Sequence, residues 1–264
     1  MRFTKKPIIW GIICLSLFVI FLNSKNINDQ KSPIQEQTQR IQNYTLALTW
    51  HEGFCKNNNH KKECQKQAIN SYAQKNFVLH GLWPGMKGQY YCDEKRIPFS
   101  LGEIIIEDDK KSARWHQLPE LNLDPKLKKD LFEKMPGTLS FLHRHEWVKH
   151  GSCFIDRSPN SYYTVSLKLQ DSFNEAVLTE FIKINQGKII SVEQVKNAFA
   201  EIFGSNASKS ISMKCKPWSG KLIITEIRIN LKASLEQLNN ISVETMPHIM
   251  HRNTSKSCVR ALLI

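Results

Sequence analysis

The sequence predicts one α+β domain, with a central antiparallel β-sheet packed with several α-helices. Three observations lead to this prediction. Two strand-like segments lie in the first third of the chain, helical patterns fill its middle, and two alternating segments follow around a single turn. The 264 residues are enough for one large domain, and the 41% that are apolar can form a sizeable core.

The strands are predicted from alternation and from apolar runs. Residues 44–50, YTLALTW, alternate, and residues 76–84, NFVLHGLWP, form an apolar run that ends at a proline. Residues 210–232 alternate on both sides of a Trp-Ser-Gly turn, which predicts a hairpin. Between the first two strands, residues 55–66 are predicted to be a loop closed by its own two cysteines, and residues 85–98 a long loop rich in Gly and Pro.

The helices are predicted from periodicity and from their capping residues. They cover four segments: 124–137, 141–153, 160–187 and 191–204. Asp124 and Pro125 suit the start of the first helix, and Gly151 marks the end of the second. The third is long enough to contain a break. Ser191 and Gln194 form a capping-box pattern at the start of the fourth.

The chain is strongly basic, with a formal net charge of +13. A charge of this size favours polyanionic partners, such as nucleic acid, an anionic membrane or an acidic polysaccharide. An ordinary soluble basic surface explains the same charge equally well, so composition alone does not decide the partner.

The N-terminal region is predicted to be a targeting segment. Three basic residues precede an apolar run at 8–22, which is typical of a signal peptide and short for a membrane-spanning helix of about 20 residues. No clean cleavage site follows, so an uncleaved anchor is the alternative. We therefore divide the chain into a signal peptide or anchor at 1–24, a polar tether at 25–43 and a domain at 44–264.

Export changes the interpretation of the cysteines. Six lie beyond Cys14, and an even number in an exported protein indicates disulfides, for which 15 pairings exist. The chain contains no CxxC pair, which argues against a zinc ribbon or a thioredoxin-type redox site.

The segment HEWVKHGSC, 145–153, carries several chemically active side chains. On a helix, Glu146, Lys149 and His150 project from one face, because positions three and four apart are neighbours. His145 is four residues before Lys149. Charged residues at this spacing are often only a solvated face, but the adjacent tryptophan and cysteine favour a packed site.

A second histidine, His80, lies at the end of the apolar strand at 76–84. A lone histidine there is more often a satisfied core residue. Gly81, however, would let another group approach the backbone closely, which favours a functional site.

Two histidines with a carboxylate and a lysine suit phosphodiester transfer in RNA. One imidazole can take the proton of the ribose 2′-hydroxyl, and the other can supply a proton to the departing 5′-oxygen. A fixed cation such as Lys149 can stabilise the charge that develops on the phosphorane oxygens. Glu146 can orient Lys149 or His150.

Together, FVLHGLWPG and HEWVKHGSC resemble the two active-site segments of the ribonuclease T2 family. YTLALTWHEGFC also resembles the family's first strand, in the form of bacterial periplasmic members, and MKCKPWSGKLIITEIRINLK resembles its C-terminal hairpin. The resemblance covers the chain from about Tyr44 to Cys258. It implies the family's α+β fold and an endoribonuclease that cleaves single-stranded RNA to 2′,3′-cyclic phosphates and then to 3′-phosphates.

The resemblance also implies roles for individual residues. His150 would be the general base and His80 the general acid, with Glu146 and Lys149 supporting the transition state. The remaining positions implied in binding are His145 for the phosphate and Trp83, with Tyr90 or Tyr91, for the bases. Stacking tolerates every base, so little base specificity is expected. Gly85 replaces an Asp that some members carry, which leaves the purine preference open.

Further expectations follow from the resemblance. The implied disulfides are Cys55–Cys64, Cys92–Cys153 and Cys215–Cys258. The second would fix the two active-site segments relative to one another. No metal or cofactor is implied, RNA is the expected partner, and we expect an exported monomer, periplasmic or secreted, with no obligate protein partner and no membrane contact beyond an uncleaved anchor.

Two alternatives remain at this point. HEWVK begins like the zinc motif HExxH, but its fifth position is Lys149, which is not a useful zinc ligand at neutral pH. The other is a non-catalytic basic RNA-binding or toxin-like secreted protein, which would not need the full set of His80, Glu146, Lys149 and His150.

Overall fold

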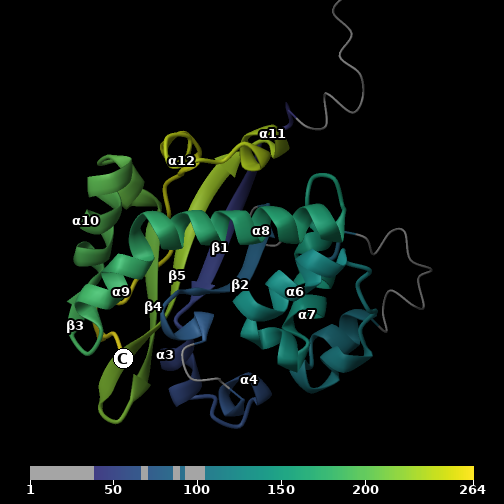
Figure 1. The fold of residues 1–264 in the computed structure, drawn as a ribbon, viewed down its shortest axis with the longest axis horizontal. Helices are drawn as coiled ribbons and strands as arrows, with labels where there is room; N and C mark the ends of the chain where they lie inside the picture. Colours follow the sequence, from purple (N-terminus) through teal and green to yellow (C-terminus); the bar gives the residue numbers. More distant parts are fainter. Residues whose placement is uncertain (1–38, 67–70, 86–89, 93–104) are drawn as a thin grey trace, which may run out of the picture. The chain divides into compact units, whose positions relative to one another are not determined.

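The structure is a computed structural model that describes residues 39–66, 71–85, 90–92 and 105–264 (Figure 1). The predicted leader at 1–24 lies outside the described residues, as do residues 25–38 of the predicted tether and most of the predicted loop at 85–98. The first strand begins at Gln42, two positions before the predicted start of the domain.

The described strands form one mixed, largely antiparallel sheet. Its strands are β1 Gln42–Thr49, β2 Val78–Pro84, β3 Ile189–Ser191, β4 Ile211–Trp218, β5 Lys221–Ala233 and β6 Arg260–Leu262. The order is β2-β1-β5-β6-β3, and β4 pairs with β5. Among the described strands, only the short pairing of β5 with β6 is parallel, so the predicted α+β class with an antiparallel sheet is confirmed.

The long strand β5 is the centre of the sheet. It pairs with β1 on one edge and with β4 on the other, and the β4–β5 turn is Ser219-Gly220. Both turn residues have positive φ, 46° and 74°, which matches the twist of a two-residue hairpin. The hairpin predicted around Trp218-Ser219-Gly220 is therefore present.

One face of the sheet is covered by α8, Pro159–Phe173, which runs across the strands in Figure 1. Tyr162 and Phe173 of α8 are completely buried in the core. The predicted break within 160–187 is a π-helical turn at Asn174–Leu178, after which α9, Thr179–Asn185, continues the helix.

The remaining larger helices lie beside the sheet. α10, Val192–Phe203, contacts β4 and begins with the predicted Ser191–Gln194 capping box. α6, Pro125–Lys134, and α7, Leu142–Lys149, are joined by a 3-10 segment, and α7 contacts β2. The predicted helix at 141–153 thus ends earlier, and a separate 3-10 turn follows at Gly151–Cys153. Other short elements include Tyr72–Gln74, Ser112–Gln117, Ala207–Ser210, α11 Leu235–Asn239 and α12 Met246–Ile249.

The prediction of a loop at 55–66 holds only for residues 57–61 and for its closure by Cys55 and Cys64. Two short helices occupy this region, α3 at His51–Lys56 and α4 at Lys62–Gln65. Gly53 lets α3 approach the backbone of β5 directly, since a Cβ there would lie 3.1 Å from the carbonyl carbon of Ile224. Tertiary packing therefore imposes helix on a segment whose polar composition indicates a loop.

All three expected cysteine pairs form disulfides: Cys55–Cys64, Cys92–Cys153 and Cys215–Cys258. The first joins α3 to α4, and the third joins β4 to the segment before β6. Within the described ranges, no helix has both the length and the apolar character needed to cross a bilayer.

Candidate active site

The predicted chemical groups gather where β2 meets α7. His80 and Trp83 lie on β2, His145, Glu146 and Lys149 lie on α7, and His150 follows α7 directly. Contacts between these side chains join the two segments, which are more than 60 positions apart in the chain.

Glu146 is the central link between the segments. Its side chain is 1% exposed, and its Oε2 accepts a hydrogen bond from Trp83 Nε1 at 2.8 Å. Its Oε1 lies 3.5 Å from His80 Nε2 and 3.8 Å from His145 Nε2. Burial raises the pKa of Glu146 above that of an ordinary carboxyl group, although the nearby histidines oppose this effect.

Gly81 makes this arrangement sterically possible. A Cβ at this position would contact Glu146 Oε2 directly and would lie 2.7 Å from Glu146 Cδ and 2.9 Å from Trp83 Nε1. The close approach to Gly81 that the sequence suggested is thus made by the carboxylate of Glu146.

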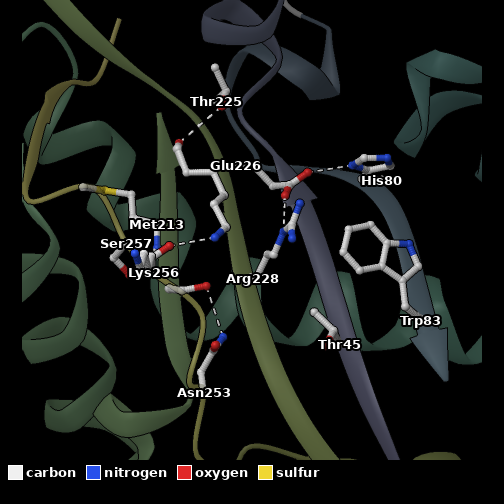
Figure 2. Close-up of polar contacts among 12 residues, drawn as sticks. Thr45, His80, Trp83, Met213, Thr225, Glu226, Arg228, Asn253, Lys256 and Ser257 are labelled. Atoms are coloured by element: carbon white, nitrogen blue, oxygen red, sulfur yellow. Dashed lines mark hydrogen bonds and ion pairs between the residues drawn. The ribbon is translucent and has the colours of Figure 1, made fainter. Parts of the chain in front are cut away.

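His80 is oriented from β5 by a residue that the sequence analysis missed. Its Nδ1 donates to Glu226 Oε2 at 2.6 Å, while Glu226 Oε1 accepts from Arg228 Nε at 2.5 Å (Figure 2). Burial acts to lower the pKa of His80, but the hydrogen bond and charge of Glu226, with the charge of Glu146, outweigh it and raise that pKa. In the same pair, burial would raise the pKa of Glu226, but His80 and Arg228 lower it.

His150 lies in the opposite electrostatic environment. It is 6% exposed, and among the described residues its Nδ1 has no hydrogen-bond partner. Burial, followed by the charges of Lys149, His145 and His80, lowers its pKa to about 2. The two environments therefore shift the pKa values of the histidines in opposite directions, up for His80 and down for His150.

Trp83 contacts both histidine rings. Its ring centroid is 5.4 Å from that of His80 and 5.4 Å from that of His150. Tyr90 contacts the His150 ring edge to face at 5.3 Å, and Lys149 Nζ lies 5.3 Å from the Tyr90 ring centroid. Tyr90 is 44% exposed, so it is the more accessible of the two aromatic rings, Trp83 and Tyr90, that contact His150.

His145 is oriented by two residues that the sequence analysis did not single out. Its Nδ1 donates to Asp109 Oδ1 at 2.8 Å, and its ring stacks on Trp115 at 4.4 Å. Tyr91, the alternative to Tyr90 for a base-stacking surface, donates its hydroxyl to Asp109 Oδ2 at 2.8 Å. The structure therefore places Tyr91 in the network that orients His145.

The Cys92–Cys153 disulfide connects the segment that carries the tyrosines to the end of α7. Beside it, Tyr91 N donates to the Lys149 carbonyl at 2.9 Å, and Cys92 N donates to Ser152 Oγ at 3.1 Å. These contacts place residues 90–92 along the turn that begins with His150.

Two sets of described residues have donor atoms spaced closely enough for a metal ion, each within 4.8 Å. In His51, Cys55 and Cys64, the sulfurs are joined in a disulfide and are not thiolate ligands. The other set is His145, Glu146 and His150, in which Asp109 accepts from His145 Nδ1 and Glu146 Oε2 accepts from Trp83. Lys149 also stands where a zinc protease motif has its second histidine.

Comparison with known proteins is consistent with this geometry. The model of the ribonuclease T2 family matches residues 41–242. Ribonuclease I of Escherichia coli is 31% identical over 203 residues, which cover 72% of this chain and 75% of that protein. Ribonuclease S-F11 of Nicotiana alata is 27% identical over 166 residues, which cover 61% of this chain and 72% of that protein.

Solved structures show the same fold. A variant of RNase MC1, from the seeds of bitter gourd, in complex with 5′-UMP aligns with a TM-score of 0.51 at 15% identity, covering 84% of this chain and 98% of that one. The S3-RNase of Japanese pear aligns with a TM-score of 0.50 at 14% identity, covering 84% and 98%. With the family model matching most of its length, this chain belongs to the ribonuclease T2 family of endoribonucleases, which act through 2′,3′-cyclic phosphate intermediates without metal ions.

Proposed function

We propose that this protein cleaves single-stranded RNA with little base specificity, using His150 as general base and His80 as general acid. The observation that supports this assignment is the opposite direction of the two pKa shifts, lowered for His150 and raised for His80, in two rings that both contact Trp83. A pair of titratable groups whose environments separate their pKa values is typical of an acid–base pair.

In the first step, His150 takes the proton of the ribose 2′-hydroxyl, and the 2′-oxygen forms a bond to phosphorus. The bond between phosphorus and the 5′-oxygen breaks, and His80 gives its proton to that oxygen. This leaves a 2′,3′-cyclic phosphate. In the second step the roles are exchanged. His80 takes a proton from water, and the water oxygen forms a bond to phosphorus. The bond between phosphorus and the 2′-oxygen breaks, and His150 gives its proton to that oxygen, which leaves a 3′-phosphate.

Lys149, Glu146 and His145 would support these steps. The Lys149 ammonium group, beside Tyr90, would stabilise negative charge on the phosphorane oxygens. Glu146 would interact with both His80 and His145 through Oε1. His145, oriented by Asp109, would donate to the phosphate.

Base binding would depend on stacking. Tyr90 offers the more exposed ring, and Trp83 a half-buried one. Tyr91 would act indirectly, through Asp109. With Gly85 in place of an acidic side chain, we expect weak discrimination between bases.

We further propose that the protein is exported to the periplasm or the exterior and acts as a monomer on RNA, with no cofactor and no obligate protein partner. Residues 1–24 would serve as its signal peptide or anchor. The three disulfides support export, because such bonds persist mainly in oxidising compartments.

The mechanism is tested with a ribodinucleotide and its 2′-deoxy analogue, incubated with the purified protein in the presence of EDTA. Only the ribodinucleotide should be cut, and a 2′,3′-cyclic phosphate should accumulate first. Cleavage of both compounds would exclude the 2′-hydroxyl mechanism, and binding without cleavage of either would favour a non-catalytic RNA-binding protein.

Glu226→Gln should shift the alkaline limb of the pH–activity profile to lower pH, so that the enzyme is active over a narrower pH range. The rate falls as the pH rises through the pKa of His80, because the general acid is then deprotonated. The substitution removes the negative charge that raises this pKa, so the alkaline limb should move to lower pH. At neutral pH we expect a loss of about tenfold in kcat/KM, as for other orienting partners of histidine.

This effect is measured from the full pH profile of kcat/KM. Glu236→Gln, which removes an exposed carboxylate on α11, is the matched control and should leave the limb in place. A Glu226→Gln profile that is lower at every pH but unmoved would mean that Glu226 has only a structural role.

A further inference from the structure

A cavity of about 450 Å³ opens beside His80. One side is formed by the β4–β5 hairpin and the other by α3 and the turn that follows it. The residues that matter for its chemistry are Phe54, Asn57, His80, Lys214, Lys216 and Arg228. None of the site roles assigned above involves the part of the cavity formed by β4.

The cavity has an excess of positive charge. Lys214, Lys216 and Arg228 contribute three cations, whereas Glu226 is its only acidic lining residue and already binds both His80 and Arg228 (Figure 2). Over the part of the chain that the structure describes, no carboxylate forms an ion pair with Lys214 or Lys216.

Lys214 has hydrogen-bond donors available for an anion and lies in an environment that an anion would stabilise. Its Nζ donates to the Lys256 carbonyl at 2.7 Å, which leaves two N–H groups available. Burial, and then the charge of Arg228, lower the pKa of Lys214. An anion between these cations would reverse that destabilisation of the charged form.

The position of His80 indicates which part of the RNA substrate would lie at this cavity. In the proposed mechanism His80 protonates the 5′-oxygen of the leaving nucleotide, so this nucleotide lies on the His80 side of the scissile phosphate. The same cavity that His80 lines is also lined by Lys214 and Lys216. The next phosphate of an RNA chain would therefore enter the region of greatest positive charge.

We propose that this cavity is a second phosphate subsite, in which Lys214 and Lys216 bind the phosphodiester on the 3′ side of the leaving nucleotide. The inference rests on the proposed function, because the roles of His80 and His150 set the direction of the chain. It identifies the preferred substrate as RNA that continues beyond the leaving nucleotide.

The test compares two substrates at constant ionic strength: a ribodinucleotide, NpN, and the same compound with a 3′-terminal phosphate, NpNp. Charge-assisted hydrogen bonds to the added phosphate should raise kcat/KM for NpNp over NpN roughly tenfold in the wild type. In the Lys214→Gln/Lys216→Gln double variant this ratio should fall below about twofold, since both cations are gone.

The matched control is Lys126→Gln/Lys129→Gln, which removes two exposed charges on α6 outside the cavity lining. Its ratio should equal that of the wild type. Equal rates for NpNp and NpN in the wild type, or an unchanged ratio in the Lys214/Lys216 variant, would overturn the subsite. Failure to cut NpN at all would instead overturn the proposed function.

Discussion

His150→Ala and His80→Ala should each reduce kcat for RNA cleavage by roughly 10²- to 10⁴-fold, the range expected for loss of one acid or base. In the proposed mechanism His150, whose pKa is lowered by burial, accepts a proton, and His80, whose pKa is raised chiefly by Glu226, supplies the proton that the 5′-oxygen needs. Because the two groups act in one step, the double variant should lose much less than the product of the two single losses.

The two roles can be separated with an aryl ester in place of the leaving nucleotide. An aryl oxide departs without protonation, so His80→Ala should regain most of its activity on this substrate, whereas His150→Ala should not. His248→Ala, which removes an exposed imidazole on α12, is the matched control and should be as active as the wild type. Thermal unfolding of each variant checks that the fold is retained. The assignment would be contradicted if His80→Ala and His150→Ala recovered equally on the aryl ester. It would also be contradicted if either variant cleaved RNA within tenfold of the wild-type rate.

Gly81→Ala should reduce kcat by about 10²-fold, although it adds one methyl group to a position that carries no functional side chain. The new Cβ would occupy the space of the Glu146 carboxylate, which is buried and bonded to Trp83 and therefore has no free volume to enter. Displacing catalytic groups by about 1 Å is enough for a loss of this size. Overpacking should also destabilise the fold by about 1–3 kcal/mol.

A double-mutant cycle with Glu146→Ala tests this explanation. Removing the carboxylate should relieve the clash, so the double variant should be more stable than the sum of the two single effects on the free energy of unfolding predicts, while it stays inactive. Additive stability effects would show that the Gly81 contact with Glu146 is not the cause. Full activity of Gly81→Ala would show that Glu146 can move without consequence.

The sequence could predict those parts of the site that are local along the chain. Glu146, Lys149 and His150 lie within five positions, so helical periodicity alone brings them to one side of α7. His80 was recognisable because a histidine, a glycine and a proline follow one another at the end of an apolar run. These features need no knowledge of the tertiary structure.

The rest of the site depends on long-range pairing. Glu226 reaches His80 because β1 lies between β2 and β5, with Thr49 opposite Glu226 in the β1–β5 register. Nothing in the alternation of β5 distinguishes Glu226 from any other polar side chain on that face. The contacts of Asp109 and Trp115 with His145 likewise could not be predicted, because they form only when the segment before α6 packs against α7.

Local backbone conformation also limited the prediction. Tyr90 and Tyr91 are adjacent and chemically alike, but Tyr91 has a φ of 56°, a left-handed conformation that is uncommon for an aromatic residue. The Tyr91 side chain bonds to Asp109, whereas Tyr90 contacts His150. The α3 and α4 helices were missed for a similar reason, since burial of His51 and Gly53 overrides a polar composition.

The Cys92–Cys153 bond has a consequence for the cell that makes this protein. Thiols stay reduced in the cytoplasm of most cells, so a newly made chain there would lack the covalent tie between the tyrosine segment and the turn carrying His150. On the proposed export, this disulfide would form only after the chain has left the compartment that contains the producer's own transcripts. Formation of the disulfide would then activate the enzyme. A form of the protein that is retained in a reducing cytoplasm should therefore be far less toxic than the same chain expressed in an oxidising cytoplasm.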